Sequence, residues 1–201
     1  MSLPLPRVHA IFSPGKPVRR ASNRSRHQAN GSRLIFVLGG ARSGKSVFAL
    51  QQGGRTSSRA FVATGEPFDR EMRLRINKHR RSRGKGWKTF EVPVQLAAWF
   101  EEKGSNFSSV VVDCLTLWLN NLLRESDRPS RVLPQLREML NAIRGCSTRV
   151  ILVSNELGLG LVPGDAVSRT FRDVAGRMNQ LVATEADEVY FLVSGLPLRL
   201  K

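Results

Sequence analysis

Cysteine, long apolar runs and clustered aromatic residues are all scarce in this sequence. Two cysteines, Cys114 and Cys146, occur among 201 residues, and they show no metal-ligand spacing. We therefore expect two reduced thiols in a cytoplasmic protein. No apolar run approaches the roughly 18 residues that a bilayer crossing requires, so we expect no membrane span. We find no aromatic-rich or helix-turn-helix motif that would support specific nucleic-acid binding.

Acidic residues are absent from residues 1–33, although this segment holds seven lysines and arginines. The whole chain carries a formal charge of +16, and the 25 basic and 16 acidic residues after the segment account for +9 of it. Four prolines and the lack of sustained periodicity predict a basic, disordered leader. It has no continuous apolar core of the kind found in secretory signals.

The leader has more than one explanation. Its arginine and serine content resembles an organellar transit peptide, but such a composition is also common in GC-rich bacterial genes. A start codon assigned upstream of the true one would look the same. We favour a dispensable bacterial tail.

The central motif joins the apolar residues 34–38 to a glycine-rich turn that fits Gly-x-x-x-x-Gly-Lys-Ser, the phosphate-binding loop. Gly39 and Gly44 allow the backbone to point its N–H groups at phosphate oxygens. Lys45 reaches the terminal phosphates, and the Ser46 hydroxyl can bind Mg²⁺. A helix over 47–52 would point its N-terminus at the phosphates. The nucleotide-contacting residues expected here are Gly39, Gly40, Ala41, Arg42, Ser43, Gly44, Lys45 and Ser46.

Apolar strands alternate with helical segments along the rest of the chain. Strands are expected at 60–63, 87–92, 109–113, 149–153 and 189–193, with a short end strand at 198–201. Helices are expected at 69–83, 93–100, 115–123, 132–143 and 165–185. The pattern predicts an α/β fold, a single P-loop NTPase-type domain over 34–201 with a mostly parallel sheet and helices on both faces. Ligands then bind at the carboxyl ends of the strands, where Gly39, Thr64, Asp113 and Asn155 fall.

Two residues are candidate Mg²⁺ ligands, Ser46 of the phosphate-binding loop and Asp113. Asp113 ends the apolar strand 109–113, which is where a P-loop enzyme places the acid that holds the magnesium shell. The alternative is a strand-end acid that caps the following turn. Because a phosphate-binding loop lies upstream, we favour the metal-ligand role for Asp113. Ser46 and Asp113 are therefore the expected metal ligands.

His79 lies in an unusual neighbourhood for a core histidine, because Lys78, Arg80, Arg81 and Arg83 surround it in the sequence. These cations favour the neutral, nucleophilic imidazole, and they also attract a triphosphate. From the residues alone, we favour a solvated basic helix face that carries an incidental histidine.

Several separated blocks resemble one family, the bifunctional adenosylcobinamide kinase/adenosylcobinamide-phosphate guanylyltransferases of cobalamin biosynthesis. The resemblance covers residues 34–201. The blocks are the loop 39–46, Ala63-Thr64 with 69–72, Arg75-Ile76 with His79, Trp87 with Glu91, Asn155-Glu156 with Gly158 and Gly160, Val162-Pro163, 171–180 and 193–195.

The resemblance implies an enzyme that phosphorylates the aminopropanol hydroxyl of adenosylcobinamide with ATP or GTP. It then transfers GMP from GTP to that phosphate through a guanylyl-histidine, giving adenosyl-GDP-cobinamide. The histidine matches His79, so His79 and Lys45 are the expected catalytic residues. Further nucleotide contacts are implied at Ala63, Thr64, Gly65, Arg80, Arg81, Ser82, Arg83, Glu91 and Asp113.

The chain departs from the family pattern at two positions. The Arg-Pro that often follows the histidine helix is Arg83-Gly84 here, which should loosen that turn, and relatives can carry Glu in place of Asp113. The leader has no counterpart in the family. The corrinoid contacts, the general base of the kinase step and the preferred phosphate donor do not follow from the sequence.

The resemblance also implies a homotrimer. The leucine-rich segment 115–123, with Trp118, has more apolar surface than one helix face usually buries, so we expect it at a subunit contact. Two other functions remain as alternatives. One is a P-loop kinase of another small molecule without nucleotidyl transfer, and the other is a nucleic-acid-binding P-loop protein, suggested by the charge alone.

Overall fold

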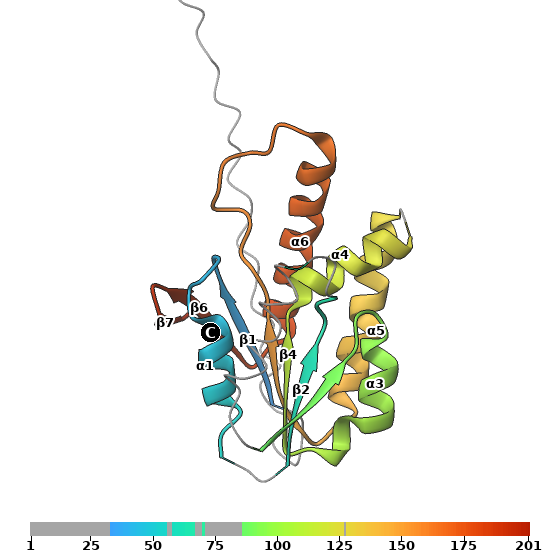
Figure 1. Cartoon of the computed structure of the whole chain (residues 1–201), viewed down its shortest axis with the longest axis vertical. Coiled ribbons are helices and arrows are strands. Elements are labelled where there is room, and N and C mark those ends of the chain that lie inside the picture. The colour runs from blue at the N-terminus through green and yellow to red at the C-terminus, as the bar shows by residue number, and fades with distance from the viewer. Residues whose placement is uncertain (1–32, 56–57, 67–69, 71–85, 127) are drawn as a thin grey trace, which may run out of the picture.

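A seven-stranded sheet forms the centre of the molecule (Figure 1). The computed structural model describes residues 33–55, 58–66, 70, 86–126 and 128–201. Along the sheet the strands follow the order β3-β2-β4-β5-β1-β6-β7, in which β7 is antiparallel to β6 and all other pairs are parallel. The strands are β1 Leu34–Gly39, β2 Arg59–Ala63, β3 Trp87–Glu91, β4 Ser109–Asp113, β5 Arg149–Val153, β6 Glu188–Val193 and β7 Leu196–Arg199.

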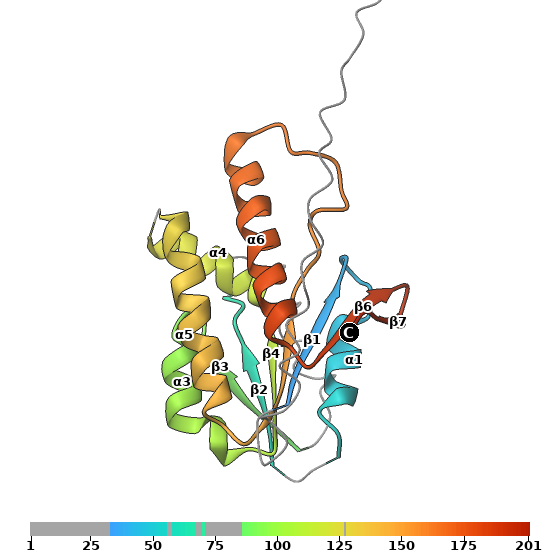
Figure 2. The same ribbon diagram turned by 180° about the vertical axis from the view of Figure 1, so that it is seen from behind.

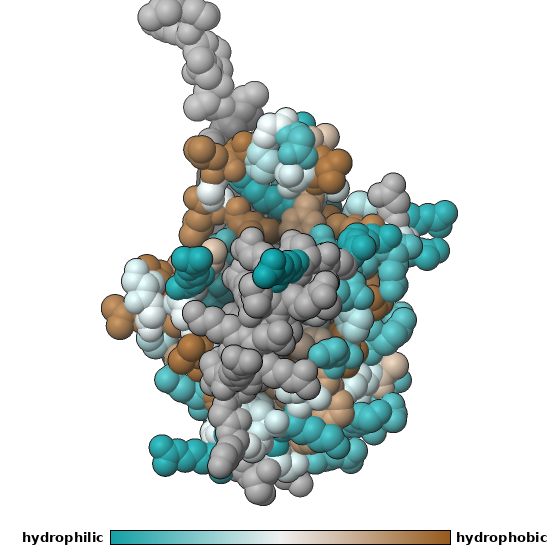
Figure 3. Space-filling model, in the orientation of Figure 1, coloured by the Kyte–Doolittle hydropathy of each residue, from teal (hydrophilic) through white to brown (hydrophobic). Residues whose placement is uncertain are grey.

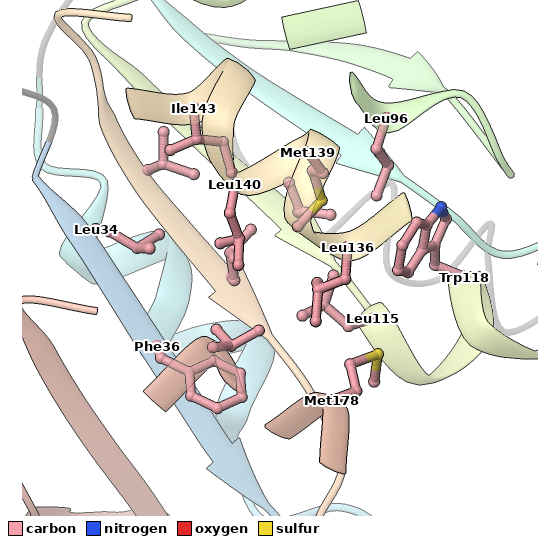
Figure 4. Close-up of a cluster of buried hydrophobic side chains, with 14 of the residues drawn as sticks. Leu34, Phe36, Leu96, Leu115, Trp118, Leu136, Met139, Leu140, Ile143 and Met178 are labelled. Carbon is pink, nitrogen blue, oxygen red and sulfur yellow. The ribbon is translucent and has the colours of Figure 1, made fainter. Parts of the chain in front are cut away.

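Helices cover both faces of the sheet, as predicted (Figures 1 and 2). In β1, Ile35 and Val37 pack with Ala49 of α1 on one face, because successive side chains of a strand point to opposite sides. Leu34 and Phe36 point to the other face, where α3, α5 and α6 pack (Figure 4). The helices are α1 Lys45–Gln52, α3 Leu96–Lys103, α4 Leu115–Glu125, α5 Val132–Arg144 and α6 Ala166–Glu185.

The expected elements agree with the observed ones to within a few residues. The largest difference is α3, which was expected to open at Pro93 but begins at Leu96, after a turn in which the Leu96 N–H donates to the Val94 carbonyl. Asp165 caps α6 as predicted, since its carboxylate accepts the Ser168 backbone N–H at 2.7 Å. Such a cap satisfies a backbone donor at the start of the helix, and the same hydrogen bond lowers the pKa of Asp165. The helix expected at 69–83 lies outside the described residues, apart from position 70.

The expectation that α4 contributes its apolar surface to a subunit contact is wrong in its physical basis. Leu115, Trp118, Leu119 and Leu122 are all buried within the chain itself. Trp118 is held in place because its Nε1 donates to the Val94 carbonyl at 2.7 Å. The apolar side of α4 therefore belongs to the core of its own chain (Figure 4).

The exposed apolar side chains gather elsewhere. The segment between β5 and α6, with the first turn of α6, exposes Leu159, Leu161, Val162 and Val167, and Leu161 is 97% exposed. Figure 3 shows apolar surface over this part of the molecule. In the described part of the chain, no helix combines the length and the apolar character needed to cross a bilayer.

Arg33, which we assigned to the leader, is tied to the folded domain. Its guanidinium pairs with Glu188 of β6, and its carbonyl accepts the Val150 N–H at 2.8 Å. The domain therefore includes Arg33 as well as β1. The rest of the predicted leader, residues 1–32, lies outside the described residues.

Candidate active site

The loop between β1 and α1 has the tightly curled backbone that its glycines predict. Gly44 has φ +94°, and a Cβ there would lie 3.2 Å from Gly195 Cα, so a side chain at this position is disfavoured by both conformation and space. The Ser43 N–H donates to the Gly40 carbonyl at 3.3 Å. Helix α1 then begins at Lys45, so its N-terminus lies directly at the loop.

Lys45 folds back over this loop. Its Nζ donates to the Gly40 carbonyl at 2.5 Å and lies 3.5 Å from Ser43 Oγ, and the side chain is buried. A buried ammonium group inside a loop of backbone N–H donors makes a site for anionic oxygens. This is the position that the motif predicts for the terminal phosphates of a nucleotide.

Neighbouring strands brace the loop from outside. The Glu156 N–H, just beyond β5, donates to the Gly39 carbonyl at 3.1 Å. The Gly195 N–H, in the turn between β6 and β7, donates to the Ser43 carbonyl at 3.0 Å. The loop is thus fixed to the carboxyl ends of two further strands, which limits its movement when a ligand binds.

A pocket of about 520 Å³ adjoins the loop. Ser46 and Val47 of α1 line it on one side, and Phe61, Trp87 and Asp113 line it from β2, β3 and β4. The Arg59 guanidinium lies over the Trp87 ring, 4.9 Å from its centroid. The expected metal residues Ser46 and Asp113 therefore face a shared cavity.

The residues at this pocket fit Mg²⁺. A hydroxyl and a carboxylate are oxygen ligands, and a P-loop site completes the magnesium shell with water and substrate phosphates instead of a cage of protein ligands. The described residues contain no group of three or more His, Cys, Asp or Glu side chains that could hold a metal ion.

Three of the predicted residues form one row at the carboxyl edge of the sheet. Ala63 is in register with Glu91 of β3 on one side and with Asp113 of β4 on the other. Gly65 lies two residues beyond the end of β2 and is half-buried, whereas Ala41, Arg42 and Glu91 are exposed. The remaining predicted residues, His79, Arg80, Arg81, Ser82 and Arg83, lie outside the described residues.

Thr64 differs from the other predicted contacts because it is fully buried. Its hydroxyl accepts the Cys114 N–H at 2.8 Å and donates to the Cys114 carbonyl at 2.7 Å. Burial, with a smaller effect from Asp113, raises the pKa of the Cys114 thiol to about 12. The thiol therefore stays neutral near pH 7 and is a poor nucleophile.

A buried polar network next to the loop was not predicted from the sequence. The Thr116 hydroxyl accepts the Asn155 N–H at 2.9 Å, and it lies 3.3 Å from Ser154 Oγ. Asn179 of α6 donates to the Asn155 carbonyl at 3.0 Å. The available signal was the position of Asn179 on the apolar side of its helix, between Ala175 and Val182.

Comparison with known proteins gives consistent relatives. The family model described as cobinamide kinase / cobinamide phosphate guanyltransferase matches residues 35–200. The bifunctional adenosylcobalamin biosynthesis protein CobP of Pseudomonas aeruginosa is 42% identical, over 83% of this chain and 96% of its own. The bifunctional adenosylcobalamin biosynthesis protein CobU of Escherichia coli is 34% identical, over 84% of this chain and 99% of its own.

Among solved structures, a KaiC-like protein of Pyrococcus horikoshii aligns with a TM-score of 0.46 and 14% identity, covering 79% of this chain and 70% of its own. The RadB recombinase aligns with a TM-score of 0.47 and 20% identity, covering 79% and 73%. The sequence relatives match nearly their whole length to the domain that carries the phosphate-binding loop. The chain therefore belongs to the cobinamide kinase / cobinamide phosphate guanyltransferase family.

Proposed function

We propose that this protein catalyses two consecutive steps of cobalamin biosynthesis. It first phosphorylates the aminopropanol hydroxyl of adenosylcobinamide with ATP or GTP. It then joins GMP from GTP to that phosphate, releasing pyrophosphate and giving adenosyl-GDP-cobinamide. The family match over residues 35–200 carries this proposal, and the pocket beside the phosphate-binding loop supports it.

The kinase step follows from the chemistry of the loop residues. The Lys45 ammonium, held at Gly40, neutralises charge on the transferred phosphoryl group. Ser46 and Asp113 would hold Mg²⁺, which would supply positive charge to polarise the nucleotide phosphates. Ala63, Gly65 and Glu91 are proposed nucleotide contacts at the same edge of the sheet. The acceptor hydroxyl attacks the γ-phosphorus, ADP or GDP leaves, and the hydroxyl proton passes to a general base.

The guanylyl step uses His79 as the nucleophile. Its neutral imidazole nitrogen attacks the α-phosphorus of GTP and expels pyrophosphate, forming a guanylyl-histidine. The substrate phosphate then attacks that phosphorus, and the imidazole leaves. Arg80, Arg81, Ser82 and Arg83, which follow in the sequence, are proposed contacts for the triphosphate.

The test is product analysis with the full-length protein, Mg²⁺ and adenosylcobinamide. With ATP as the only nucleotide, we expect adenosylcobinamide phosphate. With GTP added, we expect adenosyl-GDP-cobinamide. Both products are identified by chromatography and mass spectrometry. Formation of the phosphate without the GDP product would favour the simpler alternative, a small-molecule kinase without nucleotidyl transfer. Formation of neither product would contradict the proposal.

We propose that residues 1–31 are dispensable for this activity. A chain that begins at Ser32 keeps Arg33, whose contacts with Glu188 and Val150 anchor the start of the domain. We expect it to match the full chain in melting temperature and in both activities. A drop of several degrees in melting temperature would show that the removed segment packs on the domain.

We also propose that the protein is a cytoplasmic homotrimer. Buried, unpaired Cys114 and Cys146 are consistent with a reducing compartment. Since α4 is buried in its own chain, the exposed residues Leu159, Leu161 and Val162 are better candidates for the subunit contact. Multi-angle light scattering at micromolar concentration should return three times the chain mass, and a monomer would contradict the trimer.

A further inference from the structure

The Thr64 side chain hydrogen-bonds to Cys114, the residue that follows Asp113. Thr64 and Cys114 are 50 positions apart in the sequence. Three hydrogen bonds join the two segments. The Thr64 hydroxyl donates to the Cys114 carbonyl at 2.7 Å and accepts the Cys114 N–H at 2.8 Å, and the Thr64 N–H donates to the Asp113 carbonyl at 3.4 Å. A single side chain thus holds both polar groups of the Cys114 main chain.

This contact lies where β4 passes into α4. Asp113 is the last residue of the strand, and Cys114 is the residue before the first turn of the helix. The Cys114 carbonyl also accepts the Trp118 N–H at 3.1 Å, the first hydrogen bond of α4. The position of Asp113 is therefore set on one side by the parallel ladder and on the other by the Thr64 contact.

Thr64 is itself held rigidly. Asn121, a buried residue of α4, donates from Nδ2 to the Thr64 carbonyl at 2.8 Å and to the Pro93 carbonyl at 3.0 Å. Thr64 has no exposed surface. Its hydroxyl makes two hydrogen bonds, both with the main chain of Cys114.

We propose that Thr64 is a positioning residue for the Asp113 carboxylate and acts on magnesium through the main chain of Asp113 and Cys114. The inference rests on the proposed function, in which Asp113 and Ser46 hold Mg²⁺ beside the nucleotide. Groups that orient a metal ligand typically change metal affinity by 10- to 100-fold when they are lost. Thr64 thus controls metal-dependent nucleotide binding without touching the nucleotide through its side chain.

The substitution Thr64→Val tests this, because valine keeps the shape and removes the hydroxyl. Binding of β,γ-imido-ATP to the full chain is measured by calorimetry over a range of Mg²⁺ concentrations and in its absence. We expect the Mg²⁺ concentration for half-maximal tightening to rise about tenfold in Thr64→Val. The affinity without metal should stay within about twofold of wild type, because the phosphate-binding loop is untouched. Thr64→Ser, which retains the hydroxyl, should restore the wild-type metal dependence.

Thr148→Val is the matched control. Thr148 is 1% exposed, and its hydroxyl donates to the Gly104 and Phe107 carbonyls, both at 2.9 Å, before the start of β5 and thus at the opposite end of the sheet. This variant loses a buried hydroxyl and should melt at a lower temperature, but its metal dependence should equal that of wild type. This control distinguishes the effect of a general loss of stability from the effect of a displaced Asp113 carboxylate on the metal dependence.

The outcomes are distinguishable. An unchanged metal dependence in a folded Thr64→Val protein would overturn the positioning role and leave the proposed function intact. If Thr64→Val does not fold, Thr64→Cys keeps a weak donor and acceptor at the same place. It should show a smaller shift in the same direction, and no shift would overturn the role. Wild-type protein that binds the nucleotide equally with and without Mg²⁺ would overturn the proposed metal site itself.

Discussion

Replacing Lys45 with alanine is expected to lower the rates of both the kinase and the guanylyl step by on the order of 100-fold or more. The ammonium group is buried in the loop and held 2.5 Å from the Gly40 carbonyl, where it can stabilise negative charge on the phosphates. Steady-state rates with adenosylcobinamide and with its phosphate measure the two effects separately.

The half-buried Lys103 at the end of α3 provides a control, since Lys103→Ala removes the same charge far from the loop. This variant should retain wild-type rates in both assays. Circular dichroism should show that Lys45→Ala is folded. Undiminished kinase turnover in folded Lys45→Ala would contradict the assignment of the phosphate-binding loop.

Replacing His79 with alanine is expected to abolish a covalent GMP adduct on the protein. GTP labelled at the α-phosphate should label the wild-type chain on a denaturing gel. A phosphoramidate resists base and is cleaved by acid, which distinguishes it from a serine ester. The imidazole is suited to this role because it is both a nucleophile and a leaving group near neutral pH.

The kinase activity of His79→Ala should be retained at least in part, because γ-phosphoryl transfer does not require the covalent step. Lys78→Ala is the control, since it changes the adjacent charge and leaves the imidazole in place. It should still be labelled. An adduct of full yield in His79→Ala would exclude this residue as the acceptor, and Lys78 would become the next candidate.

The parallel sheet was predictable because its strands are short apolar runs separated by helical segments. Burial on both faces requires this composition, so Leu34–Leu38, Val110–Val112 and Val150–Val153 stand out in the sequence. The loop motif and the acid at the end of β4 then located the pocket at the carboxyl edge. In the structure, Ser46 and Asp113 line the same cavity.

The features that escaped prediction depend on contacts between distant segments. The apolar surface of α4 suggested a subunit contact, but α4 packs against α5 and α6, and its Trp118 donates to the Val94 carbonyl. The pattern of one helix cannot reveal these contacts. Thr64 matched a nucleotide-contacting segment, yet its hydroxyl is bound to Cys114. That bond joins two strand ends that become neighbours only in the folded sheet.

The strand order has a consequence for how the protein is made. β1 is among the first described elements to leave the ribosome, but its partners in the sheet are β5 and β6. The Leu34 N–H, for example, donates to the Asp187 carboxylate 153 residues later. Contacts of such large sequence separation form slowly. The nascent chain can therefore pair β2, β3 and β4 early, but it cannot form both backbone contacts to the phosphate-binding loop until Glu156 and Gly195 have been synthesised.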